Sequence, residues 1–188
     1  MRDAETSPAD PVIAETRAWL EHAVIGLNLC PFAKAVHTKG QVRYVVSEAT
    51  GAETLLQDLL AEMARLVATD PAEVDTTLLI HPQVLGDFLD FNDFLALADE
   101  AQAEAGLEGV LQVASFHPRF QFAGTEPDDI TNATNRAPYP TLHLLREASV
   151  DRAVAAFPEA ETIFEANMKT LEELGADGWA RLQTRWKD

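Results

Sequence analysis

The 188-residue sequence has one cysteine, no long apolar run and few basic residues. A single cysteine, Cys30, cannot form a disulfide within the chain, which is typical of proteins from a reducing compartment. No apolar run approaches the roughly 20 residues that a membrane-spanning helix needs. The segment from Met1 to Asp10 is polar and acidic, without the apolar stretch of a secretory signal. We therefore expect a cytoplasmic protein with no membrane partner.

Basic residues are scarce relative to acidic ones, with 14 Lys and Arg against 31 Asp and Glu, and the formal net charge is −17. A surface with this much negative charge repels the phosphates of nucleic acids. Nucleic acid is therefore not an expected partner either. A hydrophobic share of 47% is enough for a buried core, and 188 residues suit one domain. We expect a flexible arm over residues 1–9 and a single α/β domain over residues 10–188.

Apolar residues recur at helical spacing in three segments, which predict helices from Pro11 to about Leu29, from Gly51 to Asp70, and from Asp87 to near Gly106. Short apolar runs between them predict strands at 42–47, 76–80 and 111–116. Glycine and prolines over 123–140 predict an ordered loop. Helices are expected again from about Thr141 and from Pro158, the latter closed by Gly175 and followed by a short last helix.

Strands that alternate with long helices favour parallel pairing through crossover connections. The predicted fold class is α/β: a small, mostly parallel three-stranded sheet, or a mixed one, with packed helices and a helical C-terminal third. If all three strands are parallel, their carboxyl ends share the edge where open α/β folds bind ligands. If the third strand is antiparallel, its end lies at the opposite edge.

Two of the predicted strands end in the same dipeptide, His81-Pro82 and His117-Pro118. Proline stops a central strand because it has no N–H, and it restricts the backbone of the histidine before it. A well-held imidazole suits metal binding or proton transfer. A satisfied histidine at a plain strand end is the alternative for each residue.

A helix from Pro140 would place His143 and Glu147 on one face, one turn apart. A histidine and a carboxylate so arranged can bind a metal, and His81 and His117 could complete the ligand set. A divalent metal is therefore the candidate cofactor. The alternative is a hydrogen bond between His143 and Glu147 on a helix surface.

Arg119, Arg136 and Arg146 stand beside these histidines in the sequence. Guanidinium groups bind carboxylate or phosphate through paired hydrogen bonds, which predicts an anion subsite. Asn135 and Tyr139 are further candidates for substrate contacts. The alternative is pairing with nearby acidic side chains, and for asparagine a bond to the loop's own backbone.

Cys30 would be the N-cap of a short helix if Pro31 is that helix's first residue. The helix dipole would then make the thiol nucleophilic, with His37 among the histidines that could serve as its partner. The alternative is a small buried apolar residue.

Several segments resemble a known family: 27–33 with Leu-Asn-Leu-Cys-Pro-Phe-Ala, 112–122 with Phe-His-Pro, 135–140 with Asn-Arg-Ala-Pro-Tyr-Pro, and 142–147. Over about Trp19 to Val150 the chain is similar to the uncharacterised family catalogued as domain of unknown function 1415. The resemblance implies no activity. It implies only that the family pattern contains Cys30, His117, Asn135, Arg136, His143, Arg146 and Glu147. Ala137 stands where the family pattern leads us to expect serine, so no hydroxyl chemistry is assigned there.

These residues predict an enzyme for a small, polar, anionic molecule, with hydrolysis among the candidate reactions. His117, His143 and Glu147 would supply acid–base or metal-ligand groups, and the arginines would hold the anion. One alternative is a thiol enzyme with Cys30 as the nucleophile. Another is a module that binds a small molecule or a protein without turnover. The sequence does not indicate an oligomeric state.

Overall fold

A computed structural model describes residues 10–187, so the arm expected over residues 1–9 lies outside the described residues. The strands are β1 (Val42–Val46), β2 (Thr76–Ile80), β3 (Leu111–Phe116) and β4 (Thr141–Arg146). The α-helices are α1 (Pro11–Trp19), α2 (Ala33–Thr38), α3 (Ala52–Ala68), α4 (Phe88–Glu104), α5 (Glu147–Ala156) and α6 (Ile163–Gln183). The shorter helical segments are η1 (Leu20–Ile25), η2 (Ile130–Asn135), η3 (Ala160–Thr162) and η4 (Thr184–Trp186).

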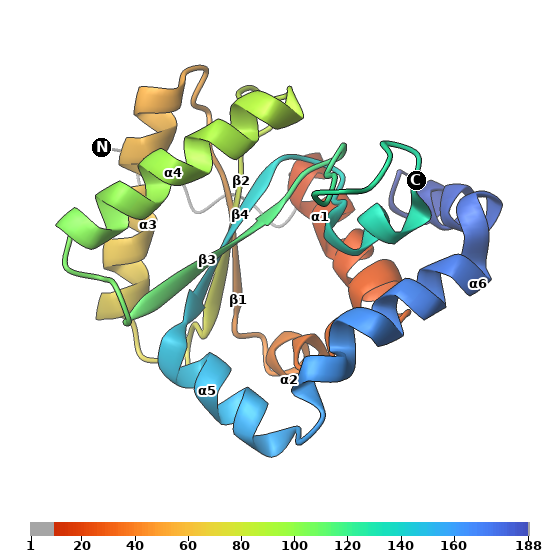
Figure 1. Ribbon diagram of the computed structural model, residues 1–188. Helices are drawn as coiled ribbons and strands as arrows, with labels where there is room; N and C mark the ends of the chain where they lie inside the picture. The colour runs from red at the N-terminus through yellow and green to blue at the C-terminus, as the bar shows by residue number, and fades with distance from the viewer. Residues whose placement is uncertain (1–9, 188) are drawn as a thin grey trace.

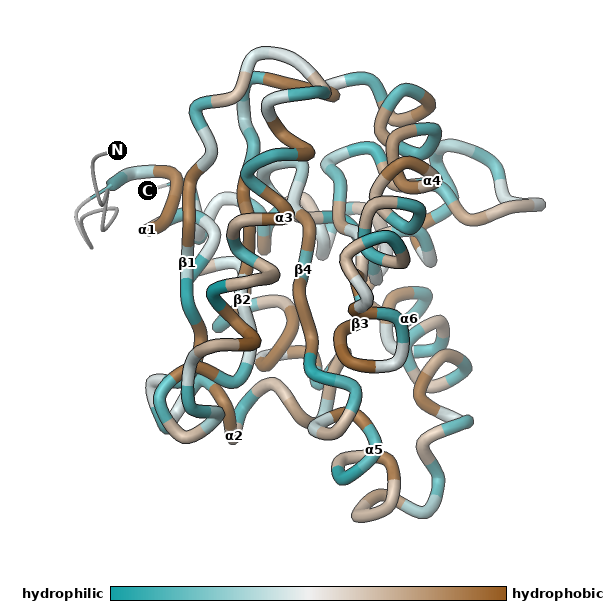
Figure 2. Tube along the Cα trace, turned by 90° about the vertical axis from the view of Figure 1, so that its left-hand side faces the viewer, coloured by the Kyte–Doolittle hydropathy of each residue, from teal (hydrophilic) through white to brown (hydrophobic). Residues whose placement is uncertain are grey.

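One sheet lies between two layers of helices (Figure 1). Helices α3 and α4 cover one face, whereas α1, α2 and α6 lie on the other side, and α5 follows the end of β4. Figure 2 shows the strands as mostly hydrophobic stretches of the chain between these helices. Within residues 10–187, no helix combines the length and the apolar character needed to cross a membrane.

The strands lie in the order β1-β2-β4-β3. β1 and β2 are parallel, whereas β4 runs antiparallel to both of its neighbours, β2 and β3. β1, β2 and β3 therefore point in the same direction, and the two His-Pro dipeptides lie at one edge of the sheet. The α/β class is confirmed, with the sheet in its mixed form.

The segment 141–146, where we expected a helix to begin, is instead strand β4. The sheet consequently has four strands rather than three. Leu142 and Leu144 pack into the core beneath α3 and α4, whereas His143 and Leu145 line the opposite face. This two-residue alternation is that of a strand. A run of six residues is too short for its periodicity to separate strand from helix, so partner strands on both edges decide.

The start of the first helix and the glycine break in α6 follow the sequence signals, although α6 begins at Ile163 rather than at Pro158. The Asp10 side chain accepts a hydrogen bond from the backbone N–H of Val12 at 2.8 Å, and Pro11 is the first helical residue. α1 continues into the π-helix η1, a type of wide turn that is frequent at functional sites. Gly175, with a φ of 69°, breaks α6 into two helices, and the second carries Trp179.

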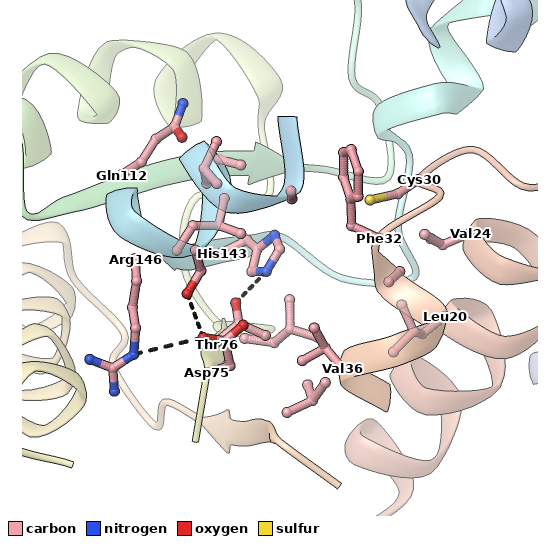
Figure 3. Close-up of a pocket in the computed structure, with 18 of the residues that line it drawn as sticks. Leu20, Val24, Cys30, Phe32, Val36, Asp75, Thr76, Gln112, His143 and Arg146 are labelled. Atoms are coloured by element: carbon pink, nitrogen blue, oxygen red, sulfur yellow. Dashed lines mark hydrogen bonds and ion pairs between the residues drawn. The ribbon is translucent and has the colours of Figure 1, made fainter. Parts of the chain in front are cut away.

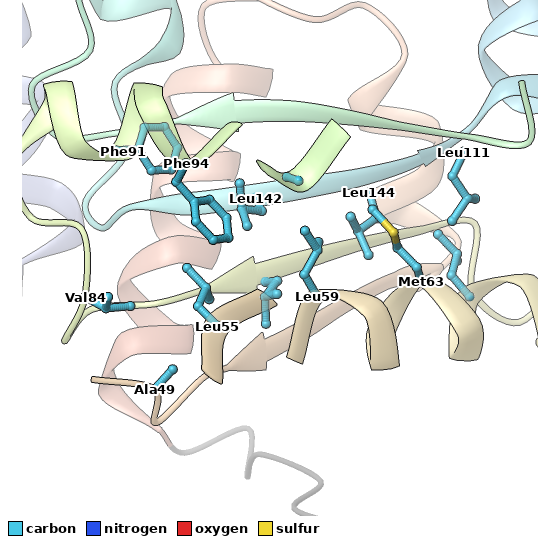
Figure 4. Close-up of a cluster of buried hydrophobic side chains, with 13 residues drawn as sticks. Ala49, Leu55, Leu59, Met63, Val84, Phe91, Phe94, Leu111, Leu142 and Leu144 are labelled. Atoms are coloured by element: carbon cyan, nitrogen blue, oxygen red, sulfur yellow. The ribbon is translucent and has the colours of Figure 1, made fainter. Parts of the chain in front are cut away.

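Each face of the sheet has its own hydrophobic core. The core under α3 and α4 is shown in Figure 4 and includes Leu55, Leu59, Met63, Phe91, Phe94, Leu142 and Leu144. The other core includes Trp19, whose ring lies edge-on against Phe116 at a centroid distance of 5.2 Å. All residues of β2 are buried, as expected for a central strand covered on both faces.

Arg146, the last residue of β4, ties the sheet to the end of α3. Its Nη2 atom lies 2.7 Å from the carbonyl oxygen of Leu66, 2.8 Å from that of Thr69 and 2.9 Å from that of Val74. The last carbonyl groups of a helix have no partner within the helix, so a cation is a favourable donor to them. Arg146 thereby fixes the connection between α3 and β2.

Replacing Arg146 with alanine should lower the free energy of unfolding by about 3 kcal/mol, because charge-assisted hydrogen bonds are lost and carbonyl groups are left unpaired. Urea denaturation followed by circular dichroism measures the change. Arg181→Ala, on the exposed side of α6, is the matched control and should cost less than about 0.5 kcal/mol. Equal stability of Arg146→Ala and the wild type would show that these carbonyl groups do not depend on the arginine.

Candidate functional site

A pocket of about 360 Å³ lies between the sheet and the helical segments α1, η1, α2 and α5 (Figure 3). Most of its wall is apolar and includes Leu20, Val24, Phe32, Val36, Phe116 and Val150. Its polar side chains are Asp75, Thr76, Gln112, His143, Arg146 and Ser149. Figure 3 shows the polar group on the sheet side and the apolar residues of η1 and α2 opposite it. This volume and composition are typical of small-molecule sites.

Thr76 holds His143 in one tautomer. The hydroxyl group of Thr76 donates its only hydrogen to the carbonyl oxygen of Leu144, at 2.6 Å. The same hydroxyl oxygen lies 2.6 Å from Nε2 of His143, so it must accept the hydrogen of Nε2. The neutral ring therefore carries its hydrogen on Nε2 and a lone pair on Nδ1.

His143 is neutral at physiological pH, because desolvation by the surrounding protein lowers its pKa from 6.5 to about 4. Apart from Thr76, no residue between 10 and 187 makes a hydrogen bond with the ring. In Figure 3 the ring reaches into the pocket, and the nitrogen opposite the dashed line is turned away from Thr76. Nδ1 is thus an acceptor available to a ligand.

The two charged side chains at the polar end of the pocket lie near each other. The Ser149 hydroxyl donates to Oδ1 of Asp75 at 2.6 Å. The same oxygen lies 4.0 Å from Nε of Arg146, so the two charges offset one another. Nη2 of Arg146 is engaged by backbone carbonyl groups, and its Nε is buried beside Asp75, so this arginine is poorly placed to hold an anion in the pocket.

Cys30 lines the same pocket as His143 and is partly buried. The expectation that Cys30 is a helix N-cap is wrong, because the N-cap of α2 is Phe32. The helix-dipole argument for an activated thiol therefore does not apply. His37, the partner considered from the sequence, pairs with Glu21 at 3.1 Å. His143 is the histidine that shares a pocket with the thiol.

His81 and His117 lie together at the edge of the sheet where β2 and β3 end. Both rings contact Phe91 of α4, at centroid distances of 5.7 and 5.1 Å. The common direction of β2 and β3 therefore does bring the two His-Pro ends together. Neither ring is part of the wall of the pocket that contains His143.

The two strand-end histidines hold the segment that follows β2. His117 donates from Nε2 to the carbonyl oxygen of Leu85 at 3.1 Å and accepts the backbone N–H of Arg119 on Nδ1 at 3.0 Å. His81 donates from Nδ1 to the carbonyl oxygen of Val84 at 3.0 Å. Leu85 has a φ of 59°, which is uncommon for leucine and needs such support. These contacts favour the structural alternative for both histidines.

The predicted metal ligands do not converge. His143 lies within β4 on the pocket face, whereas His81 and His117 pack against α4. Glu147 is the first residue of α5, so the helix face expected to carry it together with His143 does not form. In the part of the chain that the structure describes, no group of three or more His, Cys, Asp or Glu side chains could hold a metal ion.

Arg119, Arg136 and Asn135 fasten the long connection between β3 and β4. Their side chains donate to backbone carbonyl oxygens, which belong to Gly86, Phe120, Pro127 and Ser115. Arg136 and Tyr139 also line a second pocket of about 170 Å³, next to Glu15 and away from His143. Burial, followed by Glu15, raises the pKa of Tyr139 to about 12. The carbonyl contacts favour a structural role, and substrate binding by these residues stays a prediction.

Four polar residues of the pocket were not singled out from the sequence: Asp75, Thr76, Gln112 and Ser149. Threonine is an ordinary strand residue and aspartate an ordinary turn residue, so neither draws attention at the start of β2. Thr76 and His143 are 67 positions apart, and only the pairing of β2 with β4 brings them together. The alternation within 141–146, taken as a strand, is the one signal that would have placed His143 on this face.

A comparison with protein-family models finds that the one described as "Protein of unknown function (DUF1415)" matches residues 11–181. The match includes all four strands and every residue of the pocket wall. The resemblance noted in the sequence is thereby confirmed. No curated protein and no solved structure matches the chain.

The low histidine pKa values predict that the fold is less stable in acid. Burial lowers the pKa of His81 to about 4, as desolvation does for His143. The unfolded chain takes up these protons near pH 6.5, whereas the folded protein takes them up only near pH 4. The free energy of unfolding is therefore highest above pH 6.5 and falls as the pH drops from 6.5 to 4. Urea unfolding at successive pH values measures this slope.

His81→Leu removes one titrating group and should flatten the slope. The difference from the wild type should reach about 3 kcal/mol over this range, because one pKa unit corresponds to about 1.4 kcal/mol. Loss of the hydrogen bond from His81 to the carbonyl oxygen of Val84 lowers the free energy of unfolding equally at every pH, so it does not change the slope against pH. Arg181→Gln should run parallel to the wild type, whereas a wild-type slope in His81→Leu would contradict the low pKa.

Proposed function

The chain belongs to the family described as "Protein of unknown function (DUF1415)", and we propose that it is an enzyme that binds a small molecule in the larger pocket and takes a proton from it at His143. The observation that supports this most directly is the state of the imidazole. His143 is held as one neutral tautomer, and its unpartnered Nδ1 belongs to a side chain of the pocket wall.

A mostly apolar substrate fits the pocket better than the polar anion expected from the sequence. The wall is formed largely by aliphatic and aromatic side chains. Arg119, Arg136 and Arg146 all donate to backbone carbonyl groups, which gives little support to an anion subsite. The described residues include no group of three or more His, Cys, Asp or Glu side chains that could hold a metal ion. Metal dependence therefore stays a prediction without support from the site.

In the proposed step, a hydrogen bound to an acidic atom of the substrate moves to Nδ1 as a proton. The electron pair of the broken bond stays on the substrate, and the ring becomes an imidazolium with both nitrogens protonated. A pKa of about 4 keeps His143 in its acceptor form at neutral pH. The same low pKa makes the charged ring costly, so the proton must leave again within the reaction cycle.

Replacing His143 with glutamine should slow turnover by at least about 100-fold, which is the lower range for loss of an acid–base group. Wild type and variant are incubated with a small-metabolite extract, with and without added Zn²⁺, Mn²⁺ or Fe²⁺, and the extract is followed by mass spectrometry. We expect a metabolite that the wild type consumes and the variant spares.

His22→Gln, outside the pocket wall, is the matched control and should keep wild-type turnover. Thermal unfolding checks that His143→Gln still folds. If His143→Gln and the wild type consume the metabolite at equal rates, His143 does not take part in the reaction. A metabolite that stabilises the protein but is recovered unchanged under every metal condition would favour the binding module over the enzyme.

A second candidate is a thiol enzyme, favoured by the observation that Cys30 and His143 line one pocket. The thiol proton would move to Nδ1 of His143, and the thiolate would then add to a carbonyl carbon of the substrate, whose π electron pair would move to the carbonyl oxygen. The helix dipole supplies no help, because Phe32 rather than Cys30 caps α2. His143 is thus the group on which activation would depend.

Alkylation of Cys30 by iodoacetamide tests this candidate. His143→Gln should slow alkylation if His143 takes the thiol proton. Ala153→Trp, which adds bulk to the α5 side of the pocket wall, should slow it by blocking access. Unchanged rates in His143→Gln, at unchanged thermal stability, would leave Cys30 as a packing residue.

We infer a small-molecule partner from the larger pocket, and a cytoplasmic location from the single cysteine, which cannot form a disulfide within the chain. The net charge of −17 disfavours binding to nucleic acid and to anionic lipid. Fractionation of cells that produce the protein, with the small molecules that co-purify, tests both inferences.

A further inference from the structure

The hydroxyl and imidazole N–H donors at the polar end of the larger pocket are engaged within the protein. Thr76 gives its hydroxyl hydrogen to Leu144, and His143 gives its Nε2 hydrogen to Thr76. Ser149 gives its hydroxyl hydrogen to Asp75. These groups can therefore only accept hydrogen bonds from a ligand, chiefly at Nδ1 of His143 and at the second carboxylate oxygen of Asp75.

The two other polar residues of the wall do not reverse this balance. Arg146 directs Nη2 to three carbonyl oxygens. Its Nε has no hydrogen-bond partner, but it is buried and lies 4.0 Å from Oδ1 of Asp75, so it is not exposed to a ligand. Gln112 is exposed and can turn either end of its amide toward a ligand. The pocket is therefore neutral in net charge and richer in acceptors than in donors.

From this balance we propose that the ligand is an amphipathic molecule with no negative charge, whose N–H or O–H group donates to Nδ1 of His143. This inference rests on the proposed function and names the class of substrate. The donor end would lie against the sheet, and the apolar part against the residues of η1 and α2, among them Leu20 and Val36. A carboxylate or phosphate would face the lone pair of Nδ1 and the carboxylate of Asp75, and the only cation among the described residues of the wall, Arg146, already lies beside Asp75.

Thr76 is the positioning residue in this arrangement. It does not need to touch the ligand, because its effect passes through His143. Its single hydrogen is committed to Leu144, which fixes the hydrogen of His143 on Nε2 and leaves Nδ1 as an acceptor. A Thr76→Val variant lacks the hydroxyl group and so loses both the hydrogen bond to Leu144 and the one from His143. Thr76→Ser keeps both hydrogen bonds.

Three probes of one shape test the class of ligand: 4-phenylphenol as a donor, 4-methoxybiphenyl as an acceptor, and biphenyl-4-carboxylate as an anion. Binding to the whole chain at pH 7 is followed by the NMR signals of pocket methyl groups, including those of Leu20 and Val36. 4-Phenylphenol should bind about 5- to 10-fold more tightly than 4-methoxybiphenyl, the effect of one hydrogen bond. Biphenyl-4-carboxylate should bind most weakly.

Equal or tighter binding of the carboxylate, or no preference for the phenol, would overturn the class of ligand. The pocket and the role of His143 in turnover would then still stand on the metabolite experiment. Failure of all three probes to perturb the pocket methyl signals would overturn the class as well. Loss of the proposed function is seen separately, as turnover that does not depend on His143.

The ring nitrogens of His143 give a test that needs no ligand. In wild type and Thr76→Ser, nitrogen NMR should show one tautomer with a bare Nδ1. In Thr76→Val, the tautomers should mix and the preference for the phenol should fall toward 1-fold. A purely structural role of Thr76 would lower stability without changing the tautomer. A protonated Nδ1 in the neutral wild-type ring would overturn the proposal whatever the probes show.

Discussion

The pairing of β4 on both of its edges is the constraint on which the rest of the structure depends. On one face it buries Leu142 and Leu144 under α3 and α4. On the other it directs His143 into the pocket, beside Thr76 of the neighbouring strand. At the end of β4, Arg146 secures the last turn of α3. Because β4 is antiparallel to both neighbours, β2 and β3 run in the same direction and end at one edge.

Local sequence signals were sufficient for most of the fold. The cap at Asp10 and the break at Gly175 lie where the residues indicated, and the alternation of strands and helices gave the α/β class. The prediction failed over residues 141–146, because six residues are too few for their apolar spacing alone to separate a strand from a helix. One misread segment accounts for both the missing fourth strand and the proposed His143–Glu147 face.

The candidate site was predictable only in part, and for a related reason. The sequence pointed to His143 and Cys30, which the structure places in one pocket, but it could not show the bond with Thr76 across the sheet. The residues taken for ligand contacts, such as His117 and Arg119, mostly serve backbone carbonyl groups. Half-buried carbonyl groups require partners, so an irregular connection competes with any ligand for the polar side chains near it.

β4 is the last strand to be synthesised, yet it lies inside the sheet. When the ribosome adds residue 140, β2 and β3 have been synthesised, but the strand that pairs with both of them has not. Completion then requires contacts between residues as far apart as Thr76 and His143, 67 positions along the chain, and contacts of such range form slowly. The nascent chain thus passes through a stage with two open sheet edges, the stage at which chaperones and aggregation compete for it.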